Sequence, residues 1–161
     1  MSKYQQKSFW CGPASIQNAL RAKGYRVGQG RIADLANTGE DGTDEDGVMS
    51  AIRALGYEAV EFGTNHKSEA ITWVNKASRD GMPALLCVDN WGHWVCVGGN
   101  CGDRLWVIDS IKSPLNQAEN GLHCLATSTL VRRWRASRKM AGKEPKWYAI
   151  GIRSLPPSSA S

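Results

Sequence analysis

The sequence predicts an α+β fold, in which N-terminal helices pack on a mainly antiparallel sheet formed by the C-terminal part. Apolar residues recur mostly at helical spacing before Gly81, whereas short β-prone runs separated by turn residues follow it. The length of 161 residues is typical of a single domain with its own core. We therefore expect one domain over residues 1–154. Residues 155–161, which are turn-forming or small and polar, are expected to form a disordered tail.

The first predicted helix runs from Pro13 to Lys23. Proline suits the first helical position, apolar residues follow at helical spacing, and Gly24 suits the residue after the helix end. A shorter helix is predicted over Gly30–Asn37. Both helices precede every predicted strand.

An acidic loop, Gly39–Gly47, precedes the third predicted helix, which carries four apolar residues and stops at Gly56. In this loop Thr43 and Asp46, three residues apart, resemble a capping box. The remaining predicted elements are a strand over Tyr57–Phe62, a helix over Lys67–Ser78, strands over Ala84–Asp89, His93–Gly99 and Arg104–Asp109, a helix over Thr127–Met140, and a strand over Lys146–Arg153.

The composition favours a cytoplasmic protein with reduced thiols. The segment Met1–Gln6 has no apolar stretch of the kind found in secretory signals, and no apolar run is long enough to cross a bilayer. Five cysteines are an odd number without regular spacing, which does not indicate a disulfide framework. Delivery by a signal-independent route stays open.

Positive charge is concentrated in the C-terminal third of the chain. Up to Ser110 there are 11 Lys and Arg residues against 13 Asp and Glu residues, whereas after it there are 9 against 2. Arg132, Arg135 and Arg138 lie on the last predicted helix. They could bind an acidic protein partner, whereas nucleic acid is not expected. The simpler alternative is that these arginines pair with the loop Glu40–Asp46 and support the fold.

Cys11 is the candidate nucleophile. It lies two residues before the helix that Pro13 opens, and the partial positive charge of a helix N-terminus stabilises a thiolate. Gly12 allows close approach of the backbone to a substrate carbonyl. The alternative is that Cys11 is a small buried apolar residue, as most free cysteines are.

Gln5 is a candidate for the oxyanion hole. A side-chain amide and the backbone N–H of a nucleophile can together bind the negative oxygen of a tetrahedral intermediate. Gln5 lies six residues before Cys11, and its neighbour Gln6 could play the same part.

The hairpin between two predicted strands brings His93 and Asp109 together. If its loop is the three residues 100–102, then Gly99 faces Asp103 and His93 lies directly opposite Asp109. Opposed side chains on one face lie close enough for a carboxylate to hold an imidazole. A loop of two or four residues would place the two side chains on opposite faces.

These residues together resemble the C39-like branch of the papain-like cysteine peptidases. The resemblance rests on Gln5, on Cys11-Gly12-Pro13-Ala14-Ser15, on His93-Trp94-Val95 and on Val107-Ile108-Asp109-Ser110. It implies a papain-like fold with the nucleophile helix first. It also implies a peptidase that uses Cys11, His93 and Asp109 as a triad, with Gln5 at the oxyanion hole. Peptide or isopeptide cleavage through a thioester is the expected reaction, and no cofactor is needed.

Two departures from the family pattern leave other functions open. Ser110 stands where the family usually has proline, and the basic segment Val131–Lys146 is not part of the pattern. One alternative is a transpeptidase resembling phytochelatin synthase. The other is an inactive papain-like scaffold that binds an acidic partner through its basic helix.

No metal site is expected. The cysteines other than Cys11 form no Cys-x-x-Cys pair, and the acidic loop lacks carboxylates at the first and last positions of a calcium-binding loop. His66 and His123 have no carboxylate partner that the sequence can place.

Overall fold

The structure, a computed structural model, describes residues 3–89, 92–111, 121–135 and 145–156 of the chain. The predicted α+β class, with its helices before most of its strands, is confirmed. In chain order the elements are α1 (Cys11–Ala22), α2 (Gln29–Leu35), α3 (Glu45–Ala54), β1 (Tyr57–Thr64), α4 (Lys67–Arg79), β2 (Ala84–Val88), β3 (His93–Cys101), β4 (Arg104–Ile108), β5 (Leu122–Leu125), α5 (Thr127–Trp134) and β6 (Trp147–Ser154).

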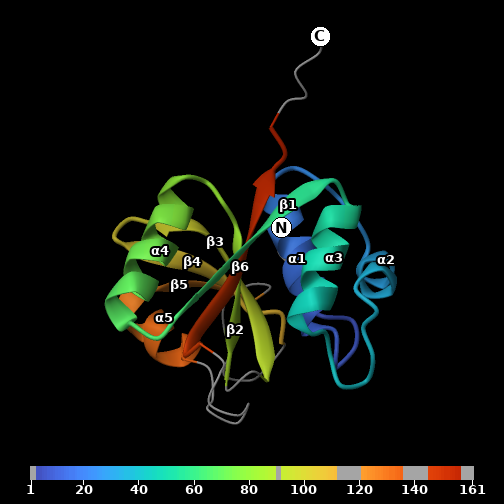
Figure 1. The fold of residues 1–161 in the computed structure, drawn as a ribbon, viewed down its shortest axis with the longest axis horizontal. Helices are drawn as coiled ribbons and strands as arrows, with labels where there is room; N and C mark the ends of the chain where they lie inside the picture. Colours follow the sequence, from blue (N-terminus) through green and yellow to red (C-terminus); the bar gives the residue numbers. More distant parts are fainter. Residues whose placement is uncertain (1–2, 90–91, 112–120, 136–144, 157–161) are drawn as a thin grey trace.

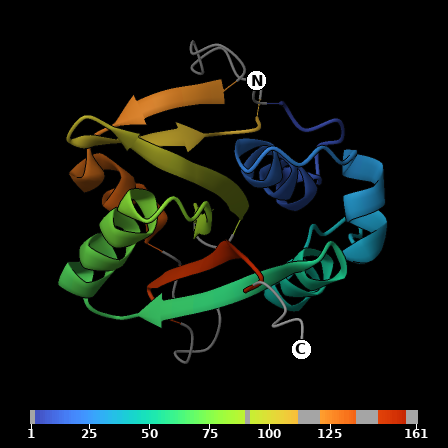
Figure 2. The same ribbon diagram turned by 90° about the horizontal axis from the view of Figure 1, so that it is seen from above.

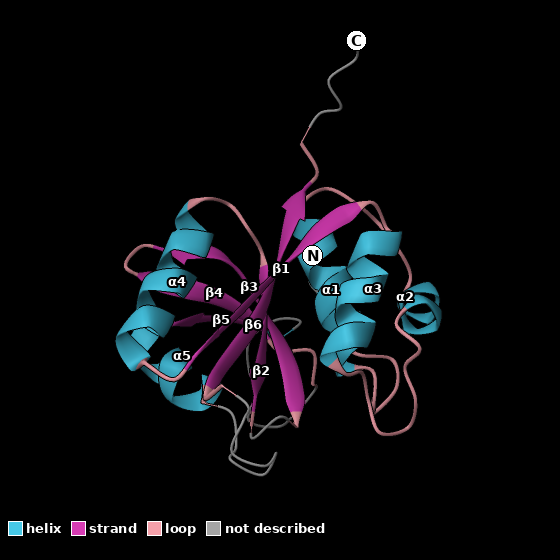
Figure 3. Cartoon of the chain, in the orientation of Figure 1, coloured by secondary structure: helices cyan, strands magenta, loops and turns pink. Residues whose placement is uncertain are grey.

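The strands form one sheet in the middle of three layers (Figure 1). Its order is β1-β6-β2-β3-β4-β5, and every neighbouring pair is antiparallel. Helices α1, α2 and α3 lie on one side of the sheet and α4 and α5 on the other (Figure 3). The view from above shows the same separation (Figure 2).

Each face of the sheet has its own apolar core. Trp94, Cys96 and Ile108 belong to the core that α1 and α3 cover. The residues that alternate with them along β3 and β4 belong to the core under α4 and α5. The predicted alternation along β3 and β4 is confirmed for these buried positions. Trp106, which the alternation predicts on the same face as Trp94, is 37% exposed. The second group consists of Val95, Val97, Leu105 and Val107.

The predicted register of the hairpin between β3 and β4 is wrong. Cys101 pairs with Arg104, so the loop has two residues rather than three. A register shift between Val97 and Gly99 then leaves one extra residue on β3. This extra residue forms a β-bulge. The two-residue loop alone would have placed His93 and Asp109 on opposite faces of the sheet, and the bulge returns them to the same face. The two residues therefore share a face, offset along the strands rather than directly opposed.

Three other predicted boundaries are corrected. Helix α1 begins at Cys11 rather than Pro13, because an early proline lacks only an N–H that would have had no helical partner. The N-cap of α3 is Asp44, whose side chain accepts a hydrogen bond from Gly47, and the expected capping box with Thr43 does not form. Helix α5 ends at Trp134 instead of continuing to Met140, and residues 136–144 lie outside the described residues.

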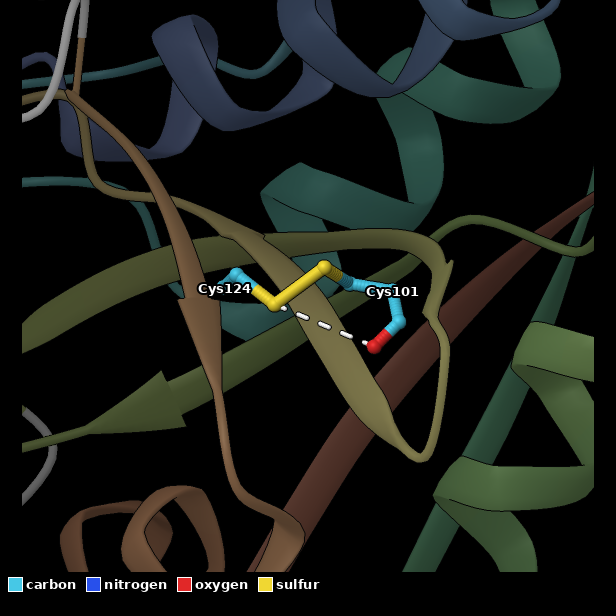
Figure 4. Close-up of a disulfide and its surroundings, with 2 residues drawn as sticks. All are labelled: Cys101 and Cys124. Atoms are coloured by element: carbon cyan, nitrogen blue, oxygen red, sulfur yellow. Dashed lines mark hydrogen bonds between the residues drawn. A yellow bond between two sulfur atoms is a disulfide. The ribbon is translucent and has the colours of Figure 1, made fainter.

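A short strand and a disulfide were not expected from the sequence. Strand β5 pairs with β4, and it brings Cys124 to Cys101 at the end of β3. The two residues form a disulfide with Cα atoms 6.1 Å apart (Figure 4). The dashed contact in Figure 4 joins Cys124 Sγ to the Cys101 carbonyl at 3.8 Å. The expectation of five reduced thiols is therefore wrong for these two.

Within the described ranges, no helix combines the length and apolar character needed to cross a membrane.

Candidate active site

Cys11 is the first residue of α1 and is partly buried. The first helical hydrogen bond runs from the Ala14 N–H to the Trp10 carbonyl, so the N–H groups before Ala14 have no partner within the helix. The next residue, Gly12, has no room for a side chain. This constraint differs from the close approach to a substrate carbonyl that the sequence suggests for it. A Cβ there would lie 2.7 Å from Thr43 Oγ1, because the acidic loop packs directly on the first turn of α1.

His93 and Asp109 form the buried polar pair of the site. His93 is the first residue of β3, and Asp109 directly follows β4, so both lie at the same end of the hairpin. The distance from His93 Nε2 to Asp109 Oδ1 is 2.8 Å, and both residues are buried. Asp109 Oδ1 also accepts a hydrogen bond from the Ile111 N–H. The carboxylate thus holds one ring nitrogen of the histidine.

The electrostatics of Cys11 and His93 favour an ion pair. Burial raises the pKa of the Cys11 thiol, but hydrogen bonds with His93 and with the Trp94 and Gly12 backbone, together with the charge of His93, lower it overall. Burial lowers the pKa of His93, but the hydrogen bonds and charges of Asp109 and Cys11 raise it to about 9. Thiolate and imidazolium therefore stabilise each other.

Asp109 stays ionised beside the histidine. Burial alone would raise the pKa of its carboxyl group, but the hydrogen bond and charge of His93 outweigh burial. The Ile111 N–H and the Arg133 charge act in the same direction, so the pKa lies well below its ordinary value.

The other thiols differ from Cys11. All five cysteines lie in the described part of the chain, and two of them are joined in the disulfide. Cys87 and Cys96 are free but buried. Burial raises the pKa of Cys96 to about 12, and burial is also the main cause that raises the pKa of Cys87. Cys11 is therefore the free thiol with both access to solvent and a lowered pKa.

Gln5 joins the loop before Cys11 to the residue after Asp109. Its Oε1 accepts a hydrogen bond from Ser110 Oγ at 3.0 Å, and its backbone N–H donates to the Ser110 carbonyl. Its amide nitrogen donates to the carbonyls of Lys7 and Ser8, so an oxyanion would have to replace one of these acceptors. Ser110, which replaces the family's proline, therefore orients Gln5. Gln6 is exposed, and its backbone N–H donates to Gln29 Oε1 at 2.9 Å.

Trp94 makes two hydrogen bonds that connect segments of the site. Its indole N–H donates to the Thr43 carbonyl at 3.0 Å, and its own carbonyl accepts from Ser15 Oγ of α1 at 3.0 Å. The strand that carries His93 is thereby tied both to α1 and to the acidic loop. The sequence alone indicated only an apolar residue after the histidine.

Arg133 is a site residue that the sequence reasoning missed. From α5 its guanidinium reaches Asp109 Oδ2 at 2.9 Å and also binds both carboxylate oxygens of Asp89. The sequence pointed to Arg132, Arg135 and Arg138 in this basic segment and gave Arg133 no separate role. Nothing in the sequence indicates that α5 brings the Arg133 side chain to Asp109, so the charge alone could not identify it.

The remaining predicted residues do not gather at the site. Arg132 and Arg135 are exposed, and Arg138 lies outside the described residues. The acidic partner therefore stays a prediction. In the part of the chain that the structure describes, no group of three or more His, Cys, Asp or Glu side chains is arranged to hold a metal ion.

The chain belongs to the Peptidase_C39 like family, which it matches over residues 1–142. An uncharacterized protein from Methanothermobacter thermautotrophicus is 36% identical over 55 residues. That match spans 34% of this chain and 39% of the relative, so it covers well under half of either protein.

Solved structures share the fold at low identity. The peptidase domain of Streptococcus ComA, a bi-functional ABC transporter involved in a quorum sensing pathway, has a TM-score of 0.69 at 17% identity over 95% of this chain and 97% of its own. A double glycine motif protease from an AMS/PCAT transporter, in complex with its leader peptide, has 0.65 at 18% over 94% and 89%. The N-terminal peptidase C39 like domain of a toxin secretion ATP-binding protein from Vibrio parahaemolyticus has 0.57 at 12% over 94% and 100%. The fold is that of C39 peptidase domains.

Proposed function

We propose that this chain is a cysteine peptidase that cleaves a peptide or isopeptide bond through a thioester on Cys11. The observation that carries the proposal is the position of His93 between Cys11 and Asp109. One ring nitrogen is held by the Asp109 carboxylate at 2.8 Å, which leaves the other for the thiol. Membership of the Peptidase_C39 like family supports the same class of reaction. The leader-peptide complex of one structural neighbour supports a peptide substrate.

The reaction proceeds in two acyl-transfer steps. The Cys11 thiolate attacks the substrate carbonyl carbon, and the C–O π electrons move to the oxygen. The Cys11 N–H and the Gln5 amide bind this oxyanion. When the tetrahedral intermediate collapses, the C–N bond breaks and the His93 imidazolium gives its proton to the leaving amine. Neutral His93 then takes a proton from water, which attacks the thioester and releases the acid and the Cys11 thiolate. Asp109 keeps the histidine in the required tautomer throughout.

Alkylation with iodoacetamide across a range of pH, with mass mapping of each cysteine, tests the proposal. We expect Cys11 to be modified first, and at pH 6 roughly tenfold or more faster than in the unfolded chain, because its thiolate forms at lower pH. Cys87 and Cys96 should react only on unfolding. The matched variant His93→Gln should return Cys11 to the behaviour of an ordinary thiol.

Two results would contradict the proposal. One is a Cys11 that reacts no faster at pH 6 in the folded wild type than in the unfolded chain. The other is a Cys11→Ala variant that retains the peptide hydrolysis measured with a mixed peptide pool.

A further inference from the structure

The carboxylate of Asp109 is held on both sides. Its Oδ1 accepts from His93 Nε2, and its Oδ2 lies 2.9 Å from Arg133 Nη2. Because the two oxygens have different partners, rotation of the carboxylate would break both contacts at once. The orientation that His93 needs is therefore linked to the position of Arg133.

Arg133 is itself fixed by a second carboxylate. Its Nε and Nη2 donate to the two oxygens of Asp89 at 3.1 and 2.9 Å, a geometry that the planar fork of a guanidinium provides and an ammonium group does not. Asp89 directly follows β2 and has a φ of 52°, a left-handed conformation that Asp and Asn adopt more readily than most residues. The same guanidinium thus connects the end of β2 to the residue after β4.

The helix that carries Arg133 is rigidly placed. The next residue, Trp134, is fully buried, and its indole N–H donates to the Tyr148 carbonyl of β6 at 2.7 Å. Leu130 and Val131 lie in the core under α5. A positioning side chain on an anchored helix holds its partner more closely than one on a loop.

We infer that Arg133 is a positioning residue of the proposed peptidase site, and that it holds Asp109 in the orientation that supports His93. This inference rests on the proposed function. The charged and titratable groups that face one another are Cys11 from α1, His93 from β3, Asp109 after β4, Arg133 from α5 and Asp89 after β2.

Positioning and simple charge predict opposite changes when Arg133 is replaced by Gln. Loss of a nearby cation, by charge alone, would stabilise the His93 imidazolium and extend the ion pair to higher pH. Loss of the held carboxylate would weaken the imidazolium, so the thiolate would form at higher pH and the imidazolium would lose its proton at lower pH. The pKa of the His93 imidazolium therefore rises in the first case and falls in the second.

Two titrations of the full chain decide between them: NMR of the His93 ring follows the imidazolium, and the rate of Cys11 alkylation by iodoacetamide follows the thiolate. For Arg133→Gln we expect His93 to lose its proton at lower pH than in the wild type, and alkylation near pH 6 to slow roughly threefold or more through the smaller thiolate fraction. Arg133→Lys keeps the charge but not the fork, and should resemble Arg133→Gln. Asp89→Asn keeps the backbone preference and removes one anchor, so it should shift both titrations in the same directions to a smaller extent. Arg132→Gln, the exposed neighbour on the same helix, should match the wild type.

Wild-type titrations of both groups in Arg133→Gln, even with a lowered Tm, would overturn the inference and show a structural role only. So would a His93 that loses its proton at higher pH in Arg133→Gln, or an Arg133→Lys variant that behaves as the wild type. If Arg133→Gln does not fold, Arg133→Lys and Asp89→Asn carry the same test. These outcomes leave the proposed function standing, whereas an ordinary thiol profile in the wild type itself would remove the proposed function first.

Discussion

His93 has two ring nitrogens, and the site gives them unequal neighbours. Nε2 faces the Asp109 carboxylate, which is ionised and buried, so the histidine is held even before a substrate arrives. Such a pair contributes to folding as well as to chemistry, because a buried carboxylate and a buried imidazole each need a partner. The same contact should therefore be detectable in a stability measurement without any substrate.

Asp109→Asn should lower the free energy of unfolding at pH 6 by on the order of 1–3 kcal/mol, because a buried charge partner is lost. The folded pKa of Asp109 lies below its ordinary value of 3.8. Its contribution is therefore fully present above pH 3.8 and is lost as the pH falls further. Denaturant unfolding of both proteins from pH 6 to acid should show the difference shrinking. The exposed substitution Asp103→Asn is the control, and a difference that grows in acid would contradict this account.

At the scale of single elements, the hairpin shows what sequence reasoning can and cannot reach. The alternation within β3 and within β4 could be read from the apolar residues, but the expected placement of His93 and Asp109 on one face rested on a three-residue loop that does not form. The loop length and the bulge at Gly98 could not be read from the sequence, since a glycine pair is compatible with several registers. The expected contact formed because a second irregularity compensated the first.

The first turn of α1 offers a test of element packing. Gly12→Ala should destabilise the fold by about 1–3 kcal/mol, because the new Cβ would overlap the side chain of Thr43. Without that contact, alanine in a helix would stabilise it by up to about 1 kcal/mol relative to glycine. Gly30→Ala is the matched control in α2, since the nearest atom to its Cβ would be 3.9 Å away.

Thr43→Gly in the Gly12→Ala background should restore much of the loss. Chemical denaturation of the four proteins of this double-mutant cycle gives the coupling free energy. A coupling close to zero would mean that the first turn shifts away from the loop at little cost.

At the scale of the whole molecule, the features missed from the sequence depend on contacts between distant segments. Strand β5 is only four residues long and lies at the sheet edge, so its pattern is too short to indicate a strand. Without β5, nothing places Cys124 beside Cys101, and nothing places α5 over Asp109. The disulfide and the contact between Arg133 and Asp109 therefore require the three-dimensional structure, whereas Cys11, His93 and Asp109 could be proposed from the sequence.

The disulfide should stabilise the sheet edge. It closes a loop with a sequence separation of 23. The double variant Cys101→Ala/Cys124→Ala should therefore lose about 2–4 kcal/mol of unfolding free energy, chiefly because its unfolded chain is less constrained. Reduction of the wild type before denaturant unfolding should produce a similar loss, and the double variant should not respond to the reductant. An equal midpoint for reduced and oxidised wild type would contradict the assignment.

The proposed nucleophile and its partners come from segments that meet only through tertiary structure. During synthesis Cys11 emerges well before His93, Asp109 and Arg133. The nascent chain therefore carries an ordinary thiol, which reacts slowly with a mild electrophile or with a peptide bond. Reactivity arrives with the closing of the hairpin and the docking of α5. The lowered pKa of Cys11 can therefore time folding: the point at which a growing or refolding chain first reacts in weak acid marks the closing of the hairpin that carries His93 and Asp109.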